Sequence, residues 1–425
     1  MQKSGVYGRG HPDVLVGSQI RLDRLEQYEG VMKVKILPPR RLDVPVLPLR
    51  MSSGKLMFPL CRSCCERLSQ DPCTCDARAR SWVGTYHTGE LKLAVSKGYV
   101  IERAYELHNF PEDRRCAYDA NNPTAGLFAG YVNAFLKLKQ ESSGYPREAV
   151  TPDQKRAYID DYAQREGVQL DPLSIAANPG RRFLAKLFLN SLWGFMGMRG
   201  HKTQYELLGR GSFARFCERV ADPSVQLKHF TILSGDAVMV EYAKKAALEE
   251  DPPNNNLYVA VYTTSLGRQK LYRALDASGR GLVYCDTDSV VFKERRGQNL
   301  LSLGNYLGDL TSEVSGDQET NYISTFVSAG AKNYAYRTTA GDEVVKVKGF
   351  TLHHANAQRV NYQTIRSLVT ENLRSGSIET VHPHSIRRHL RTLKIYSRDE
   401  VKRYSACVTK RVFDAETYGS KPYGW

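Results

Sequence analysis

Two short apolar runs flank a polar turn between Leu282 and Phe292, in the string Leu-Val-Tyr-Cys-Asp-Thr-Asp-Ser-Val-Val-Phe. Apolar, β-branched runs of this length around a tight turn predict a β-hairpin. Asp286 and Asp288 stand two residues apart at this turn, and side chains at that spacing share one face of an extended backbone. Two such charges repel unless a cation lies between them, and Mg²⁺ prefers carboxylate oxygens. The hairpin therefore predicts a magnesium site.

Periodic apolar positions predict helices ahead of this hairpin. The stripe that predicts a buried helix face over residues 127–139 consists of Leu127, Tyr131, Phe135 and Leu138. Thr151–Gln154 has the form of a capping box with proline at the first helical position, which predicts a helix that runs to Gly167. Prolines interrupt every periodic run in residues 1–60, so short strands and extended connections are expected there.

Asn178 and Pro179 begin the most informative of the predicted helices. At 100° per residue, one face carries Arg182, Lys186, Asn190 and Trp193. The opposite face, which would pack on a core, carries Phe183, Leu184, Leu187, Phe188 and Leu192. A stripe of cations, an amide and an aromatic ring can present charge to a triphosphate. A solvated amphipathic helix is the alternative for the two cations alone, but a merely solvated face rarely carries a tryptophan.

The pattern beyond residue 257 predicts an α+β layer with the two carboxylates at one edge. Leu257–Tyr262 is predicted to be a strand and Thr264–Asp276 a helix that leads into the hairpin. Two later stretches couple ammonium groups to aromatic rings, which suits contact with phosphates and stacking on bases or sugars. They are Lys332 with Tyr334, and Lys346 and Lys348 with Phe350. Lysines on a surface strand are the alternative. Residues 351–425 are basic and are expected to begin as a helix.

The charge of the chain indicates a polyanionic partner. Sixty Lys and Arg against 45 Asp and Glu give a net charge of +15, which favours nucleic acid first and an anionic membrane surface a distant second. No apolar run approaches the ~20 residues of a membrane helix. The first residues lack the apolar core of a secretory signal. An intracellular protein without a membrane partner is expected, and the sequence favours neither nucleus nor organelle.

Five of the nine cysteines cluster between residues 61 and 75. An odd number of cysteines without a secretory signal fits a metal site in a reducing compartment better than a disulfide framework. Cys61 and Cys64, together with Cys73 and Cys75, can supply four thiolates to one Zn²⁺. The second pair is more closely spaced than is common, so reduced and partly buried thiols are the alternative.

Three motifs resemble those of family B DNA polymerases. Tyr284–Ser289 resembles the Tyr-Gly-Asp-Thr-Asp-Ser motif of the palm, with Cys285 in the glycine place. Lys186–Gly194 is similar to the Lys-x₃-Asn-Ser-x-Tyr-Gly motif of the fingers, with Trp193 for tyrosine, and Lys332–Tyr334 is similar to the Lys-x-Tyr element near the primer terminus. Their order is the family's order. The flanks resemble the protein-primed polymerases of organellar, viral and Polinton (Maverick) elements at Lys55–Cys64, Leu127–Pro146 and Pro422–Trp425.

The resemblance implies an α+β right-hand polymerase fold with an incomplete palm, fingers, a thumb and inserted subdomains. The implied division is residues 1–175 for the palm remainder with the first insertion and a Cys-rich module at 61–75, 176–200 for the fingers helix, 201–256 for the second insertion, 257–350 for the palm with the hairpin, and 351–425 for the thumb.

The resemblance also implies template-directed DNA synthesis from dNTPs. A primer 3′-oxygen would attack the α-phosphorus while two Mg²⁺ ions stabilise the attacking and leaving oxygens. Asp288 would ligate both ions, and Asp286 would support the site. The implied binding roles are β- and γ-phosphate contacts for Arg182 and Lys186, nucleotide positioning for Asn190, packing on the nascent base pair for Trp193, and primer-template DNA contacts for Lys332, Tyr334, Lys346 and Lys348. A terminal protein would supply the primer.

One family motif has no counterpart in this sequence. The other metal-binding aspartate of the family lies in Asp-x-x-Ser-Leu-Tyr-Pro, ahead of the fingers, and Gly10–Pro12 looks like the segment just after it. The expectation is a truncated, poorly active polymerase that also lacks the proofreading exonuclease, and Asp13 and Asp236 are the other candidate carboxylates. The alternative function is a non-catalytic, basic, zinc-containing nucleic-acid-binding protein. A sugar-nucleotide transferase using Asp286 and Asp288 would leave the Arg182–Trp193 stripe unexplained.

Overall fold

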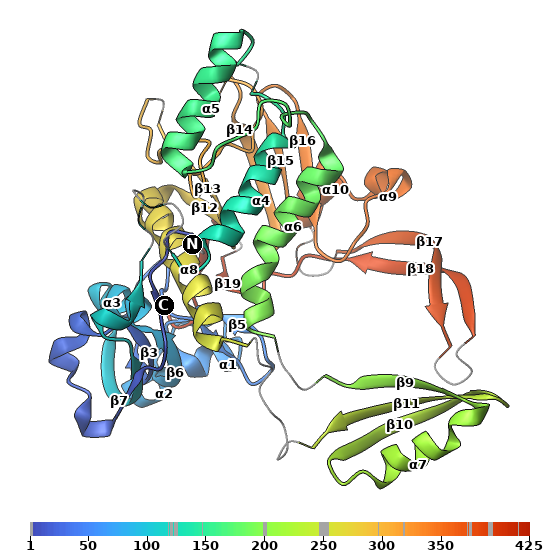
Figure 1. The fold of residues 1–425 in the computed structure, drawn as a ribbon. Coiled ribbons are helices and arrows are strands. Elements are labelled where there is room, and N and C mark those ends of the chain that lie inside the picture. Colours follow the sequence, from blue (N-terminus) through green and yellow to red (C-terminus); the bar gives the residue numbers. More distant parts are fainter. Residues whose placement is uncertain are drawn as a thin grey trace.

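The computed structural model describes residues 3–117, 119, 122, 126–146, 148–198, 202–245, 255–295, 297–317, 319–371, 373, 376–389, 394–414 and 416–425. It is a mixed structure of helices and antiparallel sheets (Figure 1). Helix α8, Leu257–Ser278, crosses its centre and contacts β6 of the largest sheet, helix α6, and the β12–β13 hairpin. None of the helices in the described part of the chain combines the length and the apolar composition that crossing a membrane requires.

The largest sheet lies in the first quarter of the chain. Its strands in spatial order are β2 (Asp13–Val16), β7 (Val100–Asn109), β3 (Gly30–Leu37) and β6 (Trp82–His87). Met32, Val34 and Ile36 alternate along β3 and are fully buried, as expected for a strand with one face on a core. Helix α3, Thr88–Ser96, packs on this sheet and on α8. Strands β1 (Tyr7–Gly8) and β8 (Arg115–Cys116) pair beside it.

Three helices follow, α4 (Ala129–Glu141), α5 (Pro152–Glu166) and α6 (Pro179–Met196). The capping box at Thr151 and the left-handed Gly167 at the end of α5 confirm the predicted boundaries. The side chain of Asn178 accepts a hydrogen bond of 3.0 Å from the backbone N–H of Arg181, which confirms the predicted start of α6.

The prediction of which face of α4 is buried is wrong. The buried apolar residues are Ala129, Val132 and Leu136, whereas Leu127 precedes the helix and is exposed. The displaced stripe instead faces α6, where the ring of Phe135 stacks on Phe188 with centroids 4.7 Å apart. α4 therefore has neighbours on two sides, and the sequence pattern pointed to only one of them.

The predicted packing of the apolar side of α6 on a core is also wrong. Phe183 is 65% exposed, and Leu184, Leu187 and Phe188 are exposed as well. Ala185 is the only described residue of α6 that is fully buried. α6 contacts α4 along its length and α8 near its end, so two helices hold it and no continuous core covers its apolar side.

The predicted strand over Leu257–Tyr262 is wrong, because these residues form the first turns of α8. The side chain of Asn256 caps the helix by accepting from the backbone N–H of Val259 at 3.1 Å. Val259 and Tyr262 are buried one helical turn apart and pack in one cluster with Tyr7 and Phe110. This packing outweighs the strand preference of a run of β-branched and aromatic residues.

The second half of the chain contains the predicted hairpin and a second sheet. The hairpin is β12 (Leu282–Asp286) and β13 (Ser289–Phe292), which confirms the prediction. The second sheet is β14 (Ile323–Gly330), β15 (Asn333–Thr338) and β16 (Glu343–Val347), and α10 (Tyr362–Thr370) packs on it. α9 (His354–Arg359) precedes α10, so the part of the chain after residue 350 begins with two helices, as predicted.

Two small modules project on the same side of the molecule in Figure 1. One consists of β9 (Gln204–Gly209), α7 (Phe213–Ala221), β10 (Val225–Ser234) and β11 (Ala237–Lys244), with β11 in the middle of its sheet. The other is a two-stranded ribbon of β17 (Ile378–Arg388) and β18 (Ile395–Tyr404). Residues 246–254 of the predicted second insertion lie outside the described residues.

The cysteine cluster packs against the C-terminal residues. Its elements are β4 (Leu49–Arg50), β5 (Leu56–Met57), α1 (Arg62–Glu66) and α2 (Ala77–Arg80). The final strands are β19 (Val412–Phe413) and β20 (Ser420–Lys421). Tyr423 is buried in the same core as Met57, Cys61 and Cys65. Short 3₁₀ segments lie at Gly17–Gln19, Leu22–Gln27, Glu112–Arg114, Arg210–Ser212 and Gly279–Gly281.

Candidate active site

The β12–β13 hairpin presents both predicted aspartates at its tip. Asp286 ends β12 and pairs with Ser289, while Thr287 and Asp288 form the two-residue turn. Thr287 has φ +48°, a left-handed value that is rare for a β-branched residue. Its hydroxyl donates to Oδ1 of Asp286 at 3.0 Å. Backbone strain of this kind clusters at functional sites, so the turn marks this tip as a candidate.

A second hairpin tip meets the first. Lys332 lies in the turn between β14 and β15 with φ +62°. Its ammonium lies 2.7 Å from Oδ1 and 2.8 Å from Oδ2 of Asp286. Its backbone N–H donates to the hydroxyl of Tyr284 at 2.8 Å. Two of the residues predicted from separate motifs, Asp286 and Lys332, are therefore in direct contact.

Aromatic rings pack next to the contact between Asp286 and Lys332. The ring of Tyr334 lies 5.0 Å from that of Tyr284 and 5.4 Å from that of Phe326, centroid to centroid. Burial raises the pKa of Tyr284 and that of Tyr334, so both hydroxyls stay protonated. Packing on Tyr284 and Phe326 thus fixes the position of Tyr334 next to the two hairpin tips.

The predicted DNA-binding lysines lie on the same sheet as Lys332. Lys346 is the cross-strand partner of Tyr334, so these two side chains share one face. Lys348 follows β16, and its backbone N–H donates to the side chain of Asn333 at 3.0 Å. Both lysines are exposed. Lys332, Tyr334, Lys346 and Lys348 thus form one basic-aromatic surface.

The two aspartates fit Mg²⁺ in chemistry but offer few ligands. Their hard oxygens suit the ion, and the ammonium of Lys332 already occupies a cation-favouring position at Asp286. Among the residues that the structure describes, no third carboxylate, histidine or cysteine joins them in a ligand cluster. Asp13 pairs with Arg114 at 2.8 Å and Asp236 with Arg210 at 3.0 Å, each in another module.

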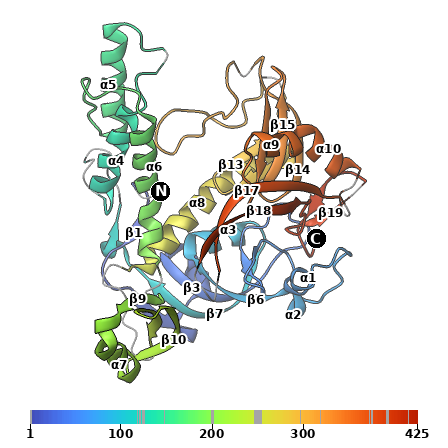
Figure 2. The same cartoon turned by 90° about the vertical axis from the view of Figure 1, so that its right-hand side faces the viewer.

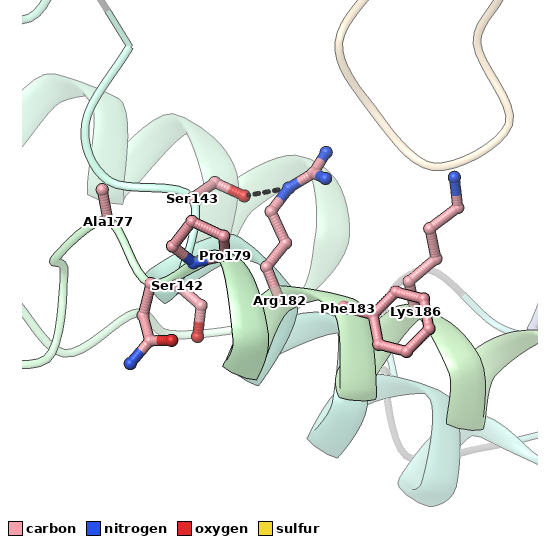
Figure 3. A pocket seen from close by; sticks show the side chains of 8 residues that line it. Ser142, Ser143, Ala177, Pro179, Arg182, Phe183 and Lys186 are labelled. Carbon is pink, nitrogen blue, oxygen red and sulfur yellow. Dashed lines mark hydrogen bonds between the residues drawn. The ribbon is translucent and has the colours of Figure 1, made fainter. Parts of the chain in front are cut away.

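The predicted nucleotide-binding residues are brought together only in part. Arg182 and Lys186 line an open cavity of 480 Å³ between α6 and the loop after α4 (Figure 3). The guanidinium of Arg182 donates through Nε to Oγ of Ser143 at 3.0 Å. Asn190 and Trp193 lie farther along α6 and do not line this cavity, although both are exposed.

Lys139 belongs to the same basic region, although the sequence motifs did not single it out as a binding residue. Burial lowers the pKa of the Lys139 ammonium, and repulsion by Arg182 and Lys186 lowers it further. Three cationic side chains this close together favour an anion among them. Lys139 and Ser143 come from α4 and the turn after it, so only the antiparallel packing of α4 on α6 brings them here.

Helix α8 connects the two parts of the candidate site. Its first residues contact the end of α6, where the backbone N–H of Asn256 donates to the carbonyl of Met196 at 2.9 Å. Its other end leads into β12, whose partner β13 lies beside that end of the helix in Figure 2. The C-terminal end of α6 and the β12–β13 hairpin are therefore held near the two ends of α8.

The four predicted zinc-binding cysteines are brought together. The sulfur atoms of Cys61, Cys64, Cys73 and Cys75 all lie within 4.8 Å of one another. The sulfurs of Cys64 and Cys75 are 3.8 Å apart, which matches the edge of about 3.8 Å of a tetrahedron with Zn–S bonds of about 2.3 Å. The backbone N–H of Cys64 also donates to the sulfur of Cys61 at 3.4 Å. The predicted cysteine cluster is confirmed, and its geometry fits Zn²⁺.

Cys65, the fifth cysteine of the cluster, is not part of this set. It is fully buried in the core, and burial, with a smaller effect of Glu66, raises the pKa of its thiol to about 12. The four-sulfur site is thus distinguished from its closest neighbour by geometry.

No family model matches the sequence, and no curated protein matches it either. Among solved structures, the chain is similar to phi29 DNA polymerase complexed with primer-template DNA and incoming nucleotide substrates. The TM-score is 0.54 and the identity 12%, over 96% of this chain and 55% of that chain. The chain thus spans about half the length of that polymerase. The α+β polymerase fold expected from the sequence motifs is confirmed: the described chain has the fold of a DNA polymerase.

Proposed function

We propose that this chain carries the nucleotide-binding and primer-binding parts of a template-directed DNA polymerase of the protein-primed family B type. The observation that carries the proposal is the contact between the tips of two hairpins, where Asp286 meets Lys332. These residues were singled out by two separate motifs, and the polymerase fold accounts for their meeting. The fold's neighbour binds primer-template DNA and incoming nucleotides, and we assign the same partners to this chain.

The residues of the chain divide the work of nucleotidyl transfer. Asp286 and Asp288 would hold Mg²⁺, which when bound activates the primer 3′-hydroxyl and neutralises the leaving pyrophosphate. Arg182 and Lys186 bind the triphosphate by charge and orient it. Lys332 and Tyr334 hold the primer end, where Lys332 balances the charge of Asp286. The proposed supporting roles along the DNA and the base pair are phosphate contacts for Lys346 and Lys348, nucleotide positioning for Asn190, and packing on the base pair for Trp193.

The proposed subdomains follow the same assignment. We assign the palm to residues 257–350 and part of 1–175, the fingers helix to 176–200, the second insertion to 201–256 and the thumb to 351–425. The insertions would accept a terminal-protein primer, as the flanking motifs suggest. We further assign a structural Zn²⁺ to Cys61, Cys64, Cys73 and Cys75, because four thiolates leave no open coordination position.

The small number of metal ligands at Asp286 and Asp288 favours a second candidate function, that of a non-catalytic nucleic-acid-binding protein. Two aspartates without a third carboxylate among the described residues are a weak two-metal site. A non-catalytic protein that binds nucleic acid through the same basic surface would retain every other feature described. Primer extension separates this candidate from the polymerase.

Replacing Lys186 with alanine is expected to weaken nucleotide binding without unfolding the chain. A charged hydrogen bond of about 1.5–3 kcal/mol is lost, which corresponds to a decrease in affinity of about 10- to 100-fold. Crosslinking of a triphosphate analogue to α6 measures the effect. Arg181→Ala is the matched control, because Arg181 carries the same charge and does not line the cavity. Equal crosslinking in wild type and Lys186→Ala would contradict the assignment.

Replacing Lys346 with alanine is expected to weaken DNA binding equally for unrelated sequences. Each phosphate contact adds about 0.9 to the slope of log affinity against log salt, so the slope should fall by about 1. Titrations of labelled primer-template at several salt concentrations measure it. Lys35→Ala is the control, since this lysine pairs with Glu102 at 2.9 Å on the other sheet. An unchanged slope would remove Lys346 from the interface.

A further inference from the structure

The C-terminal residues connect the cysteine cluster to the hairpin tips, and we call residues 407–414 and 416–425 the strap. At its first end, the backbone N–H of Cys407 donates to the carbonyl of Ala329 at 2.7 Å. Cys407 also forms a bridge with Gly330, two residues before Lys332. A Cβ atom on Gly330 would overlap the carbonyl of Cys407, so the two backbones are in direct contact.

The other end of the strap packs on the first zinc-binding cysteine. The backbone N–H of Leu60 donates to the carbonyl of Tyr423 at 2.7 Å. Tyr423 is buried, and its hydroxyl donates to the carbonyl of Thr409 at 3.1 Å, which ties the two ends of the strap together. Gly424 has φ +89°, and a Cβ atom there would overlap the backbone N and the Cβ of Cys61. The strap thus touches the cysteine cluster without space for an extra methyl group.

The middle of the strap also forms hydrogen bonds with other parts of the chain. The guanidinium of Arg411 donates to the carbonyl of Ser420 at 3.0 Å and to that of Asp43 at 3.1 Å. Burial lowers the pKa of this guanidinium, which remains charged. The backbone N–H of Phe413 donates to the side chain of Gln70, beside the cysteines, at 3.3 Å. These contacts hold Arg411 and Phe413 against the rest of the chain, between the two ends of the strap.

We propose that the strap couples the four-cysteine site to the active site, so that Zn²⁺ bound at the cysteines keeps Lys332 in place beside Asp286. The proposal rests on the zinc and polymerase roles assigned above. Close-packed segments transmit a displacement of a few tenths of an ångström instead of absorbing it. Loss of the ion releases Cys61, and through Gly424, Tyr423 and Cys407 it loosens the turn that carries Lys332. Because such coupling is reciprocal, DNA bound at the tips also tightens the binding of zinc at the cysteines.

Two glycine-to-alanine substitutions distinguish an effect of displacing Cys61 from an effect of backbone strain alone. Gly316 has the same φ of +89° as Gly424, but a Cβ atom there meets open space. Gly424→Ala and Gly316→Ala thus share one backbone cost, and only the first displaces Cys61. Zinc release from the full chain to a chromophoric chelator is expected to be at least about fivefold faster in Gly424→Ala, with Gly316→Ala like wild type. Equal release rates in the two variants would overturn the proposal.

The effect of zinc on the active site can be measured by hydrogen exchange at the backbone N–H of Lys332, which donates a hydrogen bond to Tyr284. Exchange there is expected to rise after zinc is removed from wild type, and to rise with zinc present in Gly424→Ala. Tyr423→Phe, which deletes only the hydroxyl, should act in the same direction more weakly and serves if Gly424→Ala does not fold. A chain that binds zinc but shows unchanged Lys332 exchange after its removal would overturn the coupling alone. A chain without zinc would overturn the zinc assignment and the coupling with it, and neither readout needs DNA synthesis.

Discussion

A primer annealed to a template is expected to be bound by residues 1–425 but to remain unextended with all four dNTPs and Mg²⁺ or Mn²⁺. Two-metal transfer needs ligands that converge on ions about 3.5–4 Å apart, and Asp286 and Asp288 approach from one hairpin only. Removing a charge-stabilising group from such a site typically lowers the rate by about 10²–10³-fold. Gel-based primer extension, with binding measured on the same DNA, shows whether affinity and synthesis separate.

A longer chain with an Asp-x-x-Ser-Leu-Tyr-Pro segment ahead of residue 1 is expected to extend the same primer. Asp288→Asn should abolish that synthesis while DNA binding persists, because only a metal ligand has changed. The control is Asp236→Asn, since Asp236 pairs with Arg210 in another module. Efficient synthesis by residues 1–425 would show that another carboxylate completes the site. Persistent failure of the longer chain, with DNA bound, would favour the non-catalytic binding protein.

Replacing Cys64 with serine is expected to remove zinc and to disorder residues 61–75. Zinc bound to small cysteine-rich peptides contributes about 10–16 kcal/mol of apparent binding free energy, much of which becomes folding free energy. The content should fall from about one ion per chain toward zero after dialysis, as elemental analysis and thermal unfolding would show.

Cys65→Ser is the matched control for the zinc site, because Cys65 is adjacent, buried and outside the four-sulfur cluster. It should lower thermal stability, since a hydroxyl replaces a buried thiol, yet keep the zinc content of wild type. A metal content that falls equally in both variants would contradict the tetrahedral assignment.

Local signals in the sequence were sufficient for several boundaries. The capping residues Thr151 and Asn178 and the left-handed Gly167 act within one helical turn, so their roles can be read from neighbouring residues alone. The β12–β13 hairpin is local in the same sense. The cysteine cluster was also readable, because all four ligands lie within 15 residues of one another.

Long-range packing decided what the sequence left open. The start of α8 has the composition of a strand, and its packing with Tyr7 and Phe110 favours the helix that the Asn256 cap begins. Asp286 and Lys332 are 46 residues apart in the sequence. No local periodicity could therefore predict that the Lys332 ammonium contacts the Asp286 carboxylate. Lys139 joins Arg182 through helix packing alone. The roles of these residues in catalysis and binding remain predictions that the experiments above address.

The ribbon of β17 and β18 has a consequence for how the protein behaves at high concentration. A two-stranded sheet leaves the outer edge of both strands without a partner, and unpaired edges template aggregation. Ile386 is 78% and Ile395 75% exposed on this ribbon, between arginines such as Arg388 and Arg398. Mutual repulsion of these arginines would oppose the pairing of two copies edge to edge. Salt or a polyanion that screens these charges is therefore expected to promote self-association through the ribbon, which light scattering would detect, and a low-salt buffer should keep the free protein dispersed.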